Sequence, residues 1–202
     1  MKNIRFTNDI LNAMVCPSQR GCGMIKISDI YTYPPSSFSS VLQKQTYTVL
    51  TELHIPFERV QTDEVITMDD CAQIDKKLDM KMVKTLFLCN RQQSQFYLFI
   101  TGGDKPFSSK NFSAALAVPR VSFAPAEMMF SMLDTKIGAA TVFSALYDTG
   151  NKVRIVIDKD TADQKWYGCS DGTTTGYLKI GTESIIRTFL PYTHHAADII
   201  GV

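Results

Sequence analysis

Histidine is scarce in this chain, with only His54, His194 and His195 among its 202 residues. The last two are adjacent, and neighbouring side chains on a strand or helix point in different directions. Five cysteines are present without a Cys-x-x-Cys pair, a spacing that indicates neither a zinc cage nor a disulfide framework. We therefore predict no metal and no cofactor. A serine or cysteine nucleophile activated by histidine is also disfavoured, because few bases are present to serve it.

A strong excess of charge is also missing, because 21 lysines and arginines face 20 aspartates and glutamates. With no global field to attract nucleic acid, any contact with RNA must be local and small. No run approaches the roughly 18 apolar residues that span a bilayer, and the N-terminus lacks the pattern of a secretory signal. We expect a cytoplasmic protein without a membrane partner. A hydrophobic content of 45% leaves room for one sizeable core.

Residues 1–41 differ in composition from the rest. They contain Pro17, Pro34 and Pro35 and the Ser-rich segment 36–40, and they show no sustained periodicity. Such a composition is typical of an extension or a loosely attached arm. We predict an N-terminal extension of unknown role at 1–41 and one domain at 42–202.

Strands and helices alternate irregularly along this domain. Apolar spacing and capping residues predict helices at 42–55, 67–78, 108–116, 125–133 and 182–190. Alternation and turn signals predict strands at 57–61, 84–90, 96–101, 141–145, 153–157, 177–180 and 199–202. Because the order is not a strict β-α-β repeat, the fold class is predicted as α+β, a mixed or antiparallel sheet with flanking helices.

Lys84 stands at the entrance of an apolar, strand-like run, Lys84-Thr85-Leu86-Phe87-Leu88-Cys89-Asn90. A cation beside a dry wall is suited to holding a phosphate or an ester. Taken alone, Lys84 is better explained as an exposed residue that starts the strand.

The loop Ile137-Gly138-Ala139-Ala140-Thr141-Val142 suits close approach of a ligand. Glycine lets backbone amides come near the ligand, and alanine leaves space for a compact substrate. The alternative is an ordinary turn, because lone glycines usually mark local backbone geometry. Met128, Met129 and Met132 lie at helical spacing and are predicted as core residues. Lys76, Lys77, Lys81 and Arg91 are either a path for RNA or a solvated surface.

Several short runs in a fixed order resemble the YbaK/prolyl-tRNA-synthetase-associated editing domains, especially the freestanding prolyl-tRNA editing proteins. The likeness covers about 42–202, and its runs are 84–90, 96–98 with 104–107, 120–127, 151–153 with 157–160, and 167–169. The resemblance implies an editing-domain fold. It also implies a trans-editing deacylase that hydrolyses the ester of a mischarged tRNA, with Ala-tRNA(Pro) as the first candidate. The implied partners are the tRNA acceptor end and prolyl-tRNA synthetase.

The resemblance also assigns residues to roles. Lys84 matches the functional lysine of the family, and Gly138 begins its glycine loop near the terminal ribose. Thr67 matches a threonine in the segment over the pocket, although it is equally suited to capping a helix. Thr85, Ala140 and Thr141 complete the predicted substrate-binding set together with the positions described next.

Three positions depart from the usual pattern of the family. Thr62 and Ser170 stand where close relatives carry histidine, and Ala139 stands where they often have serine. These changes leave a second function open, a catalytically weak relative that binds a tRNA end or a synthetase. A thiol enzyme using Cys89 or Cys169 is disfavoured, because neither cysteine has an evident base.

Overall fold

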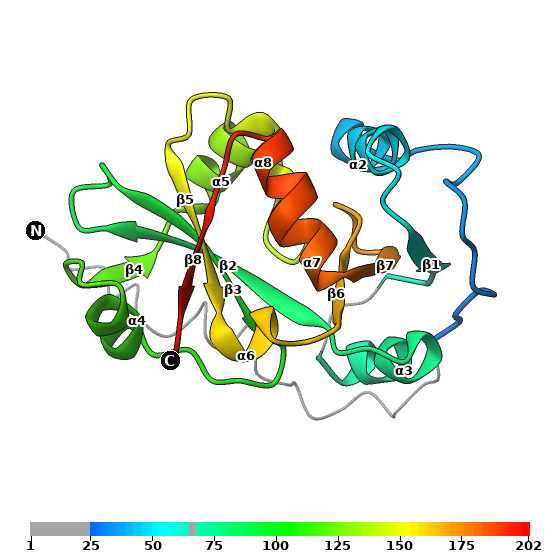
Figure 1. Ribbon diagram of the computed structural model, residues 1–202, viewed down its shortest axis with the longest axis horizontal. Helices are drawn as coiled ribbons and strands as arrows, with labels where there is room; N and C mark the ends of the chain where they lie inside the picture. The colour runs from blue at the N-terminus through cyan, green and yellow to red at the C-terminus, as the bar shows by residue number, and fades with distance from the viewer. Residues whose placement is uncertain (1–24, 65–67) are drawn as a thin grey trace, which may run out of the picture.

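The computed structural model describes residues 25–64 and 68–202. The strands of these residues are β1 (Phe57–Gln61), β2 (Val83–Asn90), β3 (Phe96–Gly102), β4 (Val121–Phe123), β5 (Val153–Asp158), β6 (Trp166–Ser170), β7 (Gly176–Gly181) and β8 (Ala197–Ile200). They form a five-stranded sheet in the order β4-β2-β3-β5-β8 and a three-stranded sheet in the order β1-β7-β6 (Figure 1).

The larger sheet is mixed. Strands β2 and β3 form the predicted antiparallel hairpin, in which Lys84 lies opposite Thr101. Strand β5 runs parallel to β3, and β8 runs parallel to β5. The smaller sheet is antiparallel throughout. The predicted α+β class with a mixed or antiparallel sheet and flanking helices is therefore confirmed.

Helices cover both sheets. The α-helices are α2 (Val41–Glu52), α3 (Met68–Leu78), α4 (Ser109–Ala115), α5 (Ala126–Leu133) and α6 (Lys159–Ala162). A 3-10 helix, η1 (Val142–Tyr147), follows α5. Near the C-terminal end, α7 (Thr182–Ser184), the π-helical η2 (Ile185–Phe189) and α8 (Leu190–Tyr192) follow one another directly. No helix in the described ranges is long and apolar enough to cross a membrane.

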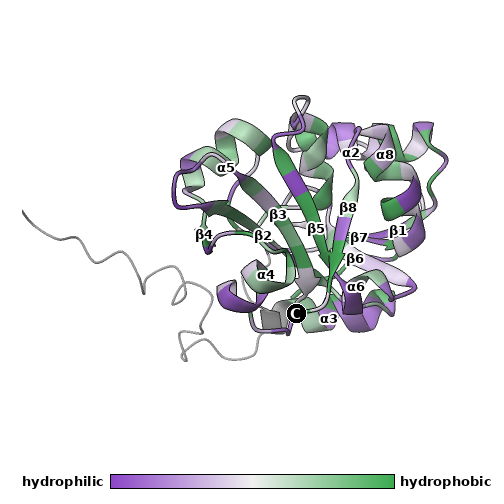
Figure 2. Ribbon diagram, turned by 60° about the vertical axis from the view of Figure 1, so that its left-hand side comes forward, coloured by the Kyte–Doolittle hydropathy of each residue, from purple (hydrophilic) through white to green (hydrophobic). Residues whose placement is uncertain are grey.

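The core has three parts, each between a sheet face and helices. The main part joins both sheets to α2, α5 and η1, and includes Leu50, Phe87 and Phe143. A second part lies between the other face of the larger sheet and Phe112 of α4. A third part packs α3 against the smaller sheet, on the side opposite α2 (Figure 1). The central strands β3 and β5 are hydrophobic along much of their length (Figure 2), as expected for strands buried on both faces.

The strand predicted at 141–145 is wrong, because these residues enter the 3-10 helix η1. Four consecutive residues, 142–145, are buried there, whereas a strand with one buried face alternates. Met129 is buried in the main core, and Met128 and Met132 pack against it, so their predicted core role is confirmed. Lys76, Lys77, Lys81 and Arg91 are exposed. The elements β4, α6 and β6 were not predicted, and β8 begins at Ala197, earlier than the tail strand expected at 199–202.

Part of the N-terminal extension lies against β1. Tyr31 and Arg59 exchange two backbone hydrogen bonds of 2.9 and 2.8 Å. The Arg59 Nε donates to the Tyr33 carbonyl at 2.6 Å, and its guanidinium lies 4.8 Å from the Tyr31 ring centroid and 5.6 Å from that of Tyr33. Residues 25–40 therefore make specific contacts with the smaller sheet. The predicted boundary between 41 and 42 remains a prediction.

Candidate functional site

The end of β6 carries a cluster of predicted site residues. Ser170 Oγ donates to the Ala139 carbonyl at 3.4 Å, and Thr141 Oγ1 donates to the Ser170 carbonyl at 3.0 Å. All three side chains are buried. Ala140, between them, is partly buried against the main core. These two hydrogen bonds fasten segment 138–141 to β6, so four predicted residues and Ser170 are brought together.

The backbone conformation at position 138 favours glycine. Its φ is +88°, in the left-handed region that favours glycine. Among the described residues, a Cβ at this position would meet only the Thr174 methyl, at 4.0 Å. Space is therefore available beside an exposed backbone. This geometry suits a loop that a ligand approaches, and it also suits an ordinary turn.

Thr62 lies beside the connection between β6 and β7, residues 171–175. Its N–H donates to the Thr175 carbonyl at 2.8 Å. Two residues later, Glu64 accepts a hydrogen bond from Thr174 at 3.3 Å. Thr62 and Ser170, the two positions at which the resemblance implies histidine, therefore both adjoin this connection. Thr67 lies outside the described residues.

Strand β2 brings Lys84 and Thr85 next to β6. Met82, just before β2, and Gly168 of β6 form an isolated parallel bridge between the two sheets, and Lys84 and Ser170 each come two residues after it in the chain. Thr85 shares a face of β2 with Val83 and Phe87, both of the main core. On that face it lies near the phenol of buried Tyr167, whose pKa is raised mainly by burial and lowered slightly by Thr85.

The Lys84 side chain leaves β2 on the opposite face, which it shares with Leu86 and Leu88. Its ammonium donates to the Gly103 carbonyl at 3.4 Å and to the Lys105 carbonyl. Partial burial lowers the pKa of Lys84, and nearby Asp104 partly offsets this effect. The hydrogen bonds of Lys84 therefore run to the loop after β3, while segment 138–141 is bonded to β6.

The buried thiols are poorly suited to nucleophilic catalysis. Burial raises the pKa of Cys169 well above its ordinary value, and burial also raises the pKa of Cys89. A thiol that stays protonated at neutral pH is a weak nucleophile. The thiol-enzyme alternative therefore has no support from these surroundings.

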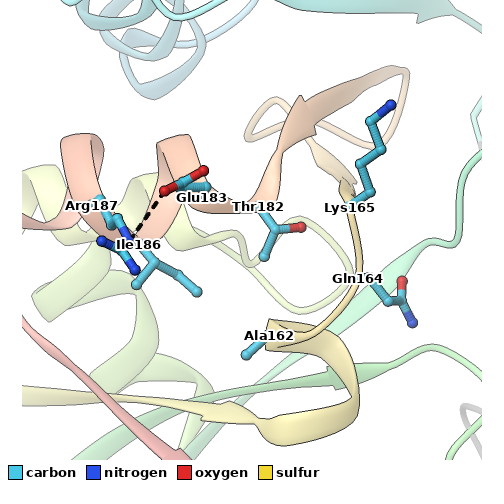
Figure 3. A pocket seen from close by; sticks show the side chains of 7 residues that line it. All are labelled: Ala162, Gln164, Lys165, Thr182, Glu183, Ile186 and Arg187. Carbon is cyan, nitrogen blue, oxygen red and sulfur yellow. Dashed lines mark ion pairs between the residues drawn. The ribbon is translucent and has the colours of Figure 1, made fainter.

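Two surface hollows lie apart from the predicted site residues. One, of about 390 Å³, lies between the α6–β6 link and the helix that starts with α7, where Glu183 and Arg187 form an ion pair of 3.3 Å (Figure 3). In Figure 3 the Lys165 side chain points away from this ion pair. The other, of about 480 Å³, lies between the start of α2, α5 and Tyr147. Neither is lined by a residue predicted for the site.

Sequence reasoning missed Asp171, which directly follows Ser170 and is buried. Its carboxylate accepts hydrogen bonds from Gln43 and Tyr47 of α2. A buried aspartate in the connection beside the predicted loop could have been noticed from the run Gly168-Cys169-Ser170-Asp171-Gly172. Its hydrogen-bond partners on α2 lie more than 120 residues away in the sequence, so they could not be predicted.

Comparison with known proteins shows the family of the chain. Residues 62–188 match the model of the aminoacyl-tRNA editing domain. The chain belongs to the aminoacyl-tRNA editing domain family. Such a domain hydrolyses the ester between an amino acid and tRNA, so the chain is a hydrolase of this class.

Individual relatives resemble the chain to different degrees. The prolyl-tRNA editing protein ProX of Acetoanaerobium sticklandii is 29% identical over 111 residues, which cover 55% of this chain and 68% of ProX. The solved structure of a proposed trans-editing enzyme for prolyl tRNA synthetase matches with a TM-score of 0.61 and 14% identity, over 82% of this chain and 99% of that one. The structure of hypothetical protein APE2540 matches with a TM-score of 0.61 and 13% identity, over 78% and 98% respectively. The two structural matches show the fold alone.

Proposed function

We propose that this editing domain acts in trans on mischarged tRNA(Pro), with Ala-tRNA(Pro) as its substrate. The observation that carries the proposal is the joining of Ser170 to Ala139 and Thr141 beside the β2 strand that bears Lys84, in a chain that matches the editing-domain model. The similarity to ProX supports tRNA(Pro) as the RNA and prolyl-tRNA synthetase as the enzyme whose errors are corrected. As part of the same proposal, the protein acts in the cytoplasm.

The chemistry requires positioning more than strong acid or base catalysis. An aminoacyl ester is already activated, so a bound water can attack it when the oxyanion is stabilised. Backbone amides around Gly138 hold the terminal ribose and the developing oxyanion, and Lys84 exchanges its two carbonyl partners for a phosphate of the acceptor end. Thr62, Thr85 and Ser170 line the path of the substrate, and the role of Thr67 stays a prediction from the resemblance.

Selectivity follows from size. Ala139 and Ala140 leave room for a small amino acid, while the larger proline that belongs on this tRNA is excluded, as in a double sieve. The hydroxyl groups of Thr141 and Ser170 already donate hydrogen bonds to protein carbonyls. Their part is therefore to hold the loop, and the water is oriented by the substrate and by main-chain groups.

Deacylation assays with Ala-, Ser- and Cys-tRNA(Pro) test the proposal. Wild type should release alanine fastest, and Lys84→Ala should lower kcat/KM by roughly a hundredfold, as expected for a lost transition-state contact. Lys110→Ala is the matched control, because Lys110 is an exposed lysine on α4, outside the proposed site. Alanine release unaffected by Lys84→Ala would contradict the assigned role, and no release from any of the three would contradict the substrate.

A binding module is the second candidate function. The observation that favours it is the use of Ser170 Oγ within the protein, at one of the two positions, with Thr62, where the resemblance implies a histidine. In that case uncharged tRNA would bind to the wild type and to Lys110→Ala more tightly than to Lys84→Ala, while none of the charged tRNAs would be hydrolysed.

A further inference from the structure

Asp171 is a buried carboxylate held by neutral donors. Only 1% of the residue is exposed. Its Oδ2 accepts hydrogen bonds from Gln43 Nε2 at 2.8 Å and Tyr47 Oη at 3.0 Å, and its Oδ1 accepts one from Thr173 Oγ1 at 2.7 Å. Within the described ranges no lysine, arginine or histidine forms an ion pair with it. A buried charge is retained only where hydrogen bonds replace its hydration.

The carboxylate lies inside the connection between β6 and β7. Asp171 N–H donates to the Gly176 carbonyl at 3.0 Å. Thr173 Oγ1, which donates to the carboxylate, accepts from the N–H groups of Gly176 at 3.0 Å and Thr175 at 3.3 Å. A Cβ on Gly176 would stand 2.0 Å from Asp171 Oδ2. Glycine at 176 therefore makes the space that the carboxylate occupies.

The same connection touches the proposed site on three sides. Ser170 precedes it, the Thr175 carbonyl accepts the Thr62 N–H at 2.8 Å, and the Thr174 methyl lies 4.0 Å from where a Gly138 Cβ would stand. Whatever fixes residues 171–176 therefore also fixes the surroundings of Thr62 and of segment 138–141.

Helix α2 supplies the anchor for this connection. Gln43 donates its amide to Asp171, while its Oε1 accepts the Ser39 N–H at 2.8 Å, so its orientation is set from both ends. Tyr47 is buried, and its pKa is raised mainly by burial and further by the Asp171 charge. The phenol therefore keeps its proton and remains a donor.

We propose that Asp171 is a positioning residue of the editing site, which ties residues 171–176 to α2 and thereby holds Thr62 and the Gly138 loop in the geometry that hydrolysis needs. The reaction that it serves rests on the proposed function. Asp171 itself touches no substrate, because its carboxylate is enclosed by Gln43, Tyr47 and Thr173.

Asp171→Asn and the double variant Gln43→Glu/Asp171→Asn test the proposal. Asparagine places an NH₂ group where a carboxylate oxygen accepted, so donor faces donor. In the double variant the carboxylate introduced at position 43 accepts from the amide introduced at position 171, and donor and acceptor exchange roles with little change in volume. Asp171→Asn should lower kcat at least about tenfold and leave KM within about threefold, since a misplaced loop weakens the transition state more than binding. The double variant should recover most of the loss.

Asp163→Asn is the matched control, because this exposed carboxylate pairs only with Lys159 in the described ranges. The NMR amide resonances of Thr62 and 138–141 give a second readout that does not depend on turnover. The chemical shifts of these amides should change in Asp171→Asn, return to the wild-type values in the double variant and remain unchanged in Asp163→Asn.

The two proposals fail in different ways. If wild type hydrolyses Ala-tRNA(Pro) but Asp171→Asn keeps its kcat and its amide resonances, the positioning role is overturned while the function stands. If wild type hydrolyses no mischarged tRNA, the function fails and the amide resonances alone decide the role of Asp171. If Asp171→Asn does not fold, Tyr47→Phe replaces it. Unchanged kcat and unchanged resonances in that variant overturn the proposal.

Discussion

At the scale of single residues, the sequence predicts the position of Lys84 in its strand but not the groups that surround its ammonium. The sequence places a cation at the entrance of an apolar strand, and the structure has Lys84 there, at the second residue of β2. The carbonyls that accept hydrogen bonds from its ammonium belong to the loop after β3, about 20 residues further along the chain. Strand alternation predicts that Lys84 and Thr85 face opposite sides. It does not predict what each side contains.

The lowered pKa of Lys84 gives a pH prediction. Because partial burial disfavours the ammonium, Lys84 should lose its proton at a lower pH than an exposed lysine. Binding of uncharged tRNA should therefore weaken in moderately alkaline buffer, measured by fluorescence anisotropy. The folded protein also binds this proton less tightly than the unfolded chain, so the group adds stability as pH rises through the folded pKa.

Lys84→Arg separates charge from position in the same titration. Arginine stays protonated over this range, so the alkaline weakening should disappear even if the affinity at neutral pH is reduced. An identical pH profile for wild type and Lys84→Arg would show that another group causes the weakening.

Gly138→Ala tests whether the loop is more than a turn. The left-handed φ of Gly138 should make alanine cost about 1 kcal/mol of unfolding free energy, measured by urea denaturation. If the loop binds substrate, deacylation at a temperature where both proteins are folded should fall by more than tenfold, because a Cβ then stands in the path of the ligand. Gly201→Ala is the control, since a Cβ there meets no atom of residues 25–64 and 68–202 within 4 Å. A stability loss without an activity loss would favour the ordinary turn.

At the scale of helices and strands, sequence patterns predict an element correctly where one of its faces is buried and the other is exposed. The helices α2, α4 and α5 were predicted by capping residues or apolar spacing, and the hairpin of β2 and β3 by two apolar runs around a polar link. The patterns fail where burial comes from several sides. Segment 142–145 is buried throughout, so its composition does not distinguish a strand from the 3-10 helix η1. Strand β4 has three residues, too few for any periodicity.

Asp148 links the end of the 3-10 helix η1 to the start of β5, so its removal should destabilise the protein. One of its carboxylate oxygens accepts the Lys152 N–H at 2.9 Å, and the other accepts the Val153 N–H at 2.7 Å. The latter oxygen also lies 3.2 Å from His195 Nε2. Asp148→Ala should lower the free energy of unfolding by about 3 kcal/mol, because it leaves the buried Val153 N–H and the partly buried Lys152 N–H without partners.

Asp198→Ala is the comparison for Asp148→Ala. Asp198 forms an exposed ion pair with Arg154 at 2.9 Å, and such pairs contribute about 0–1 kcal/mol. Equal losses for the two variants in urea denaturation would show that the buried contacts of Asp148 contribute no more than a surface pair.

At the scale of the whole molecule, the relation between the N-terminal extension and the domain could not be predicted. Proline and serine in 1–41 indicate an arm, and this composition carries no trace of the contacts that Tyr31 and Tyr33 make with Arg59. Those contacts join residues more than 25 positions apart, so no local pattern records them. The family model begins at residue 62, and the extension precedes the matched region.

Removal of residues 1–41 therefore tests whether the domain ends where the sequence suggests. The deletion removes the partners of buried Arg59 and also Ser40, whose hydroxyl accepts the Gln43 N–H at 3.0 Å as the N-cap of α2. A hydrogen bond from a charged group contributes about 1.5–3 kcal/mol and an N-cap about 1. The shortened chain should thus lose about 3 kcal/mol in urea denaturation, and Ser40→Ala in the full chain about a third of that. Since Gln43 also orients Asp171, the deletion should slow deacylation beyond its effect on stability. A shortened chain as stable and as active as the full one would show that the arm is dispensable and that 42–202 is the complete functional domain.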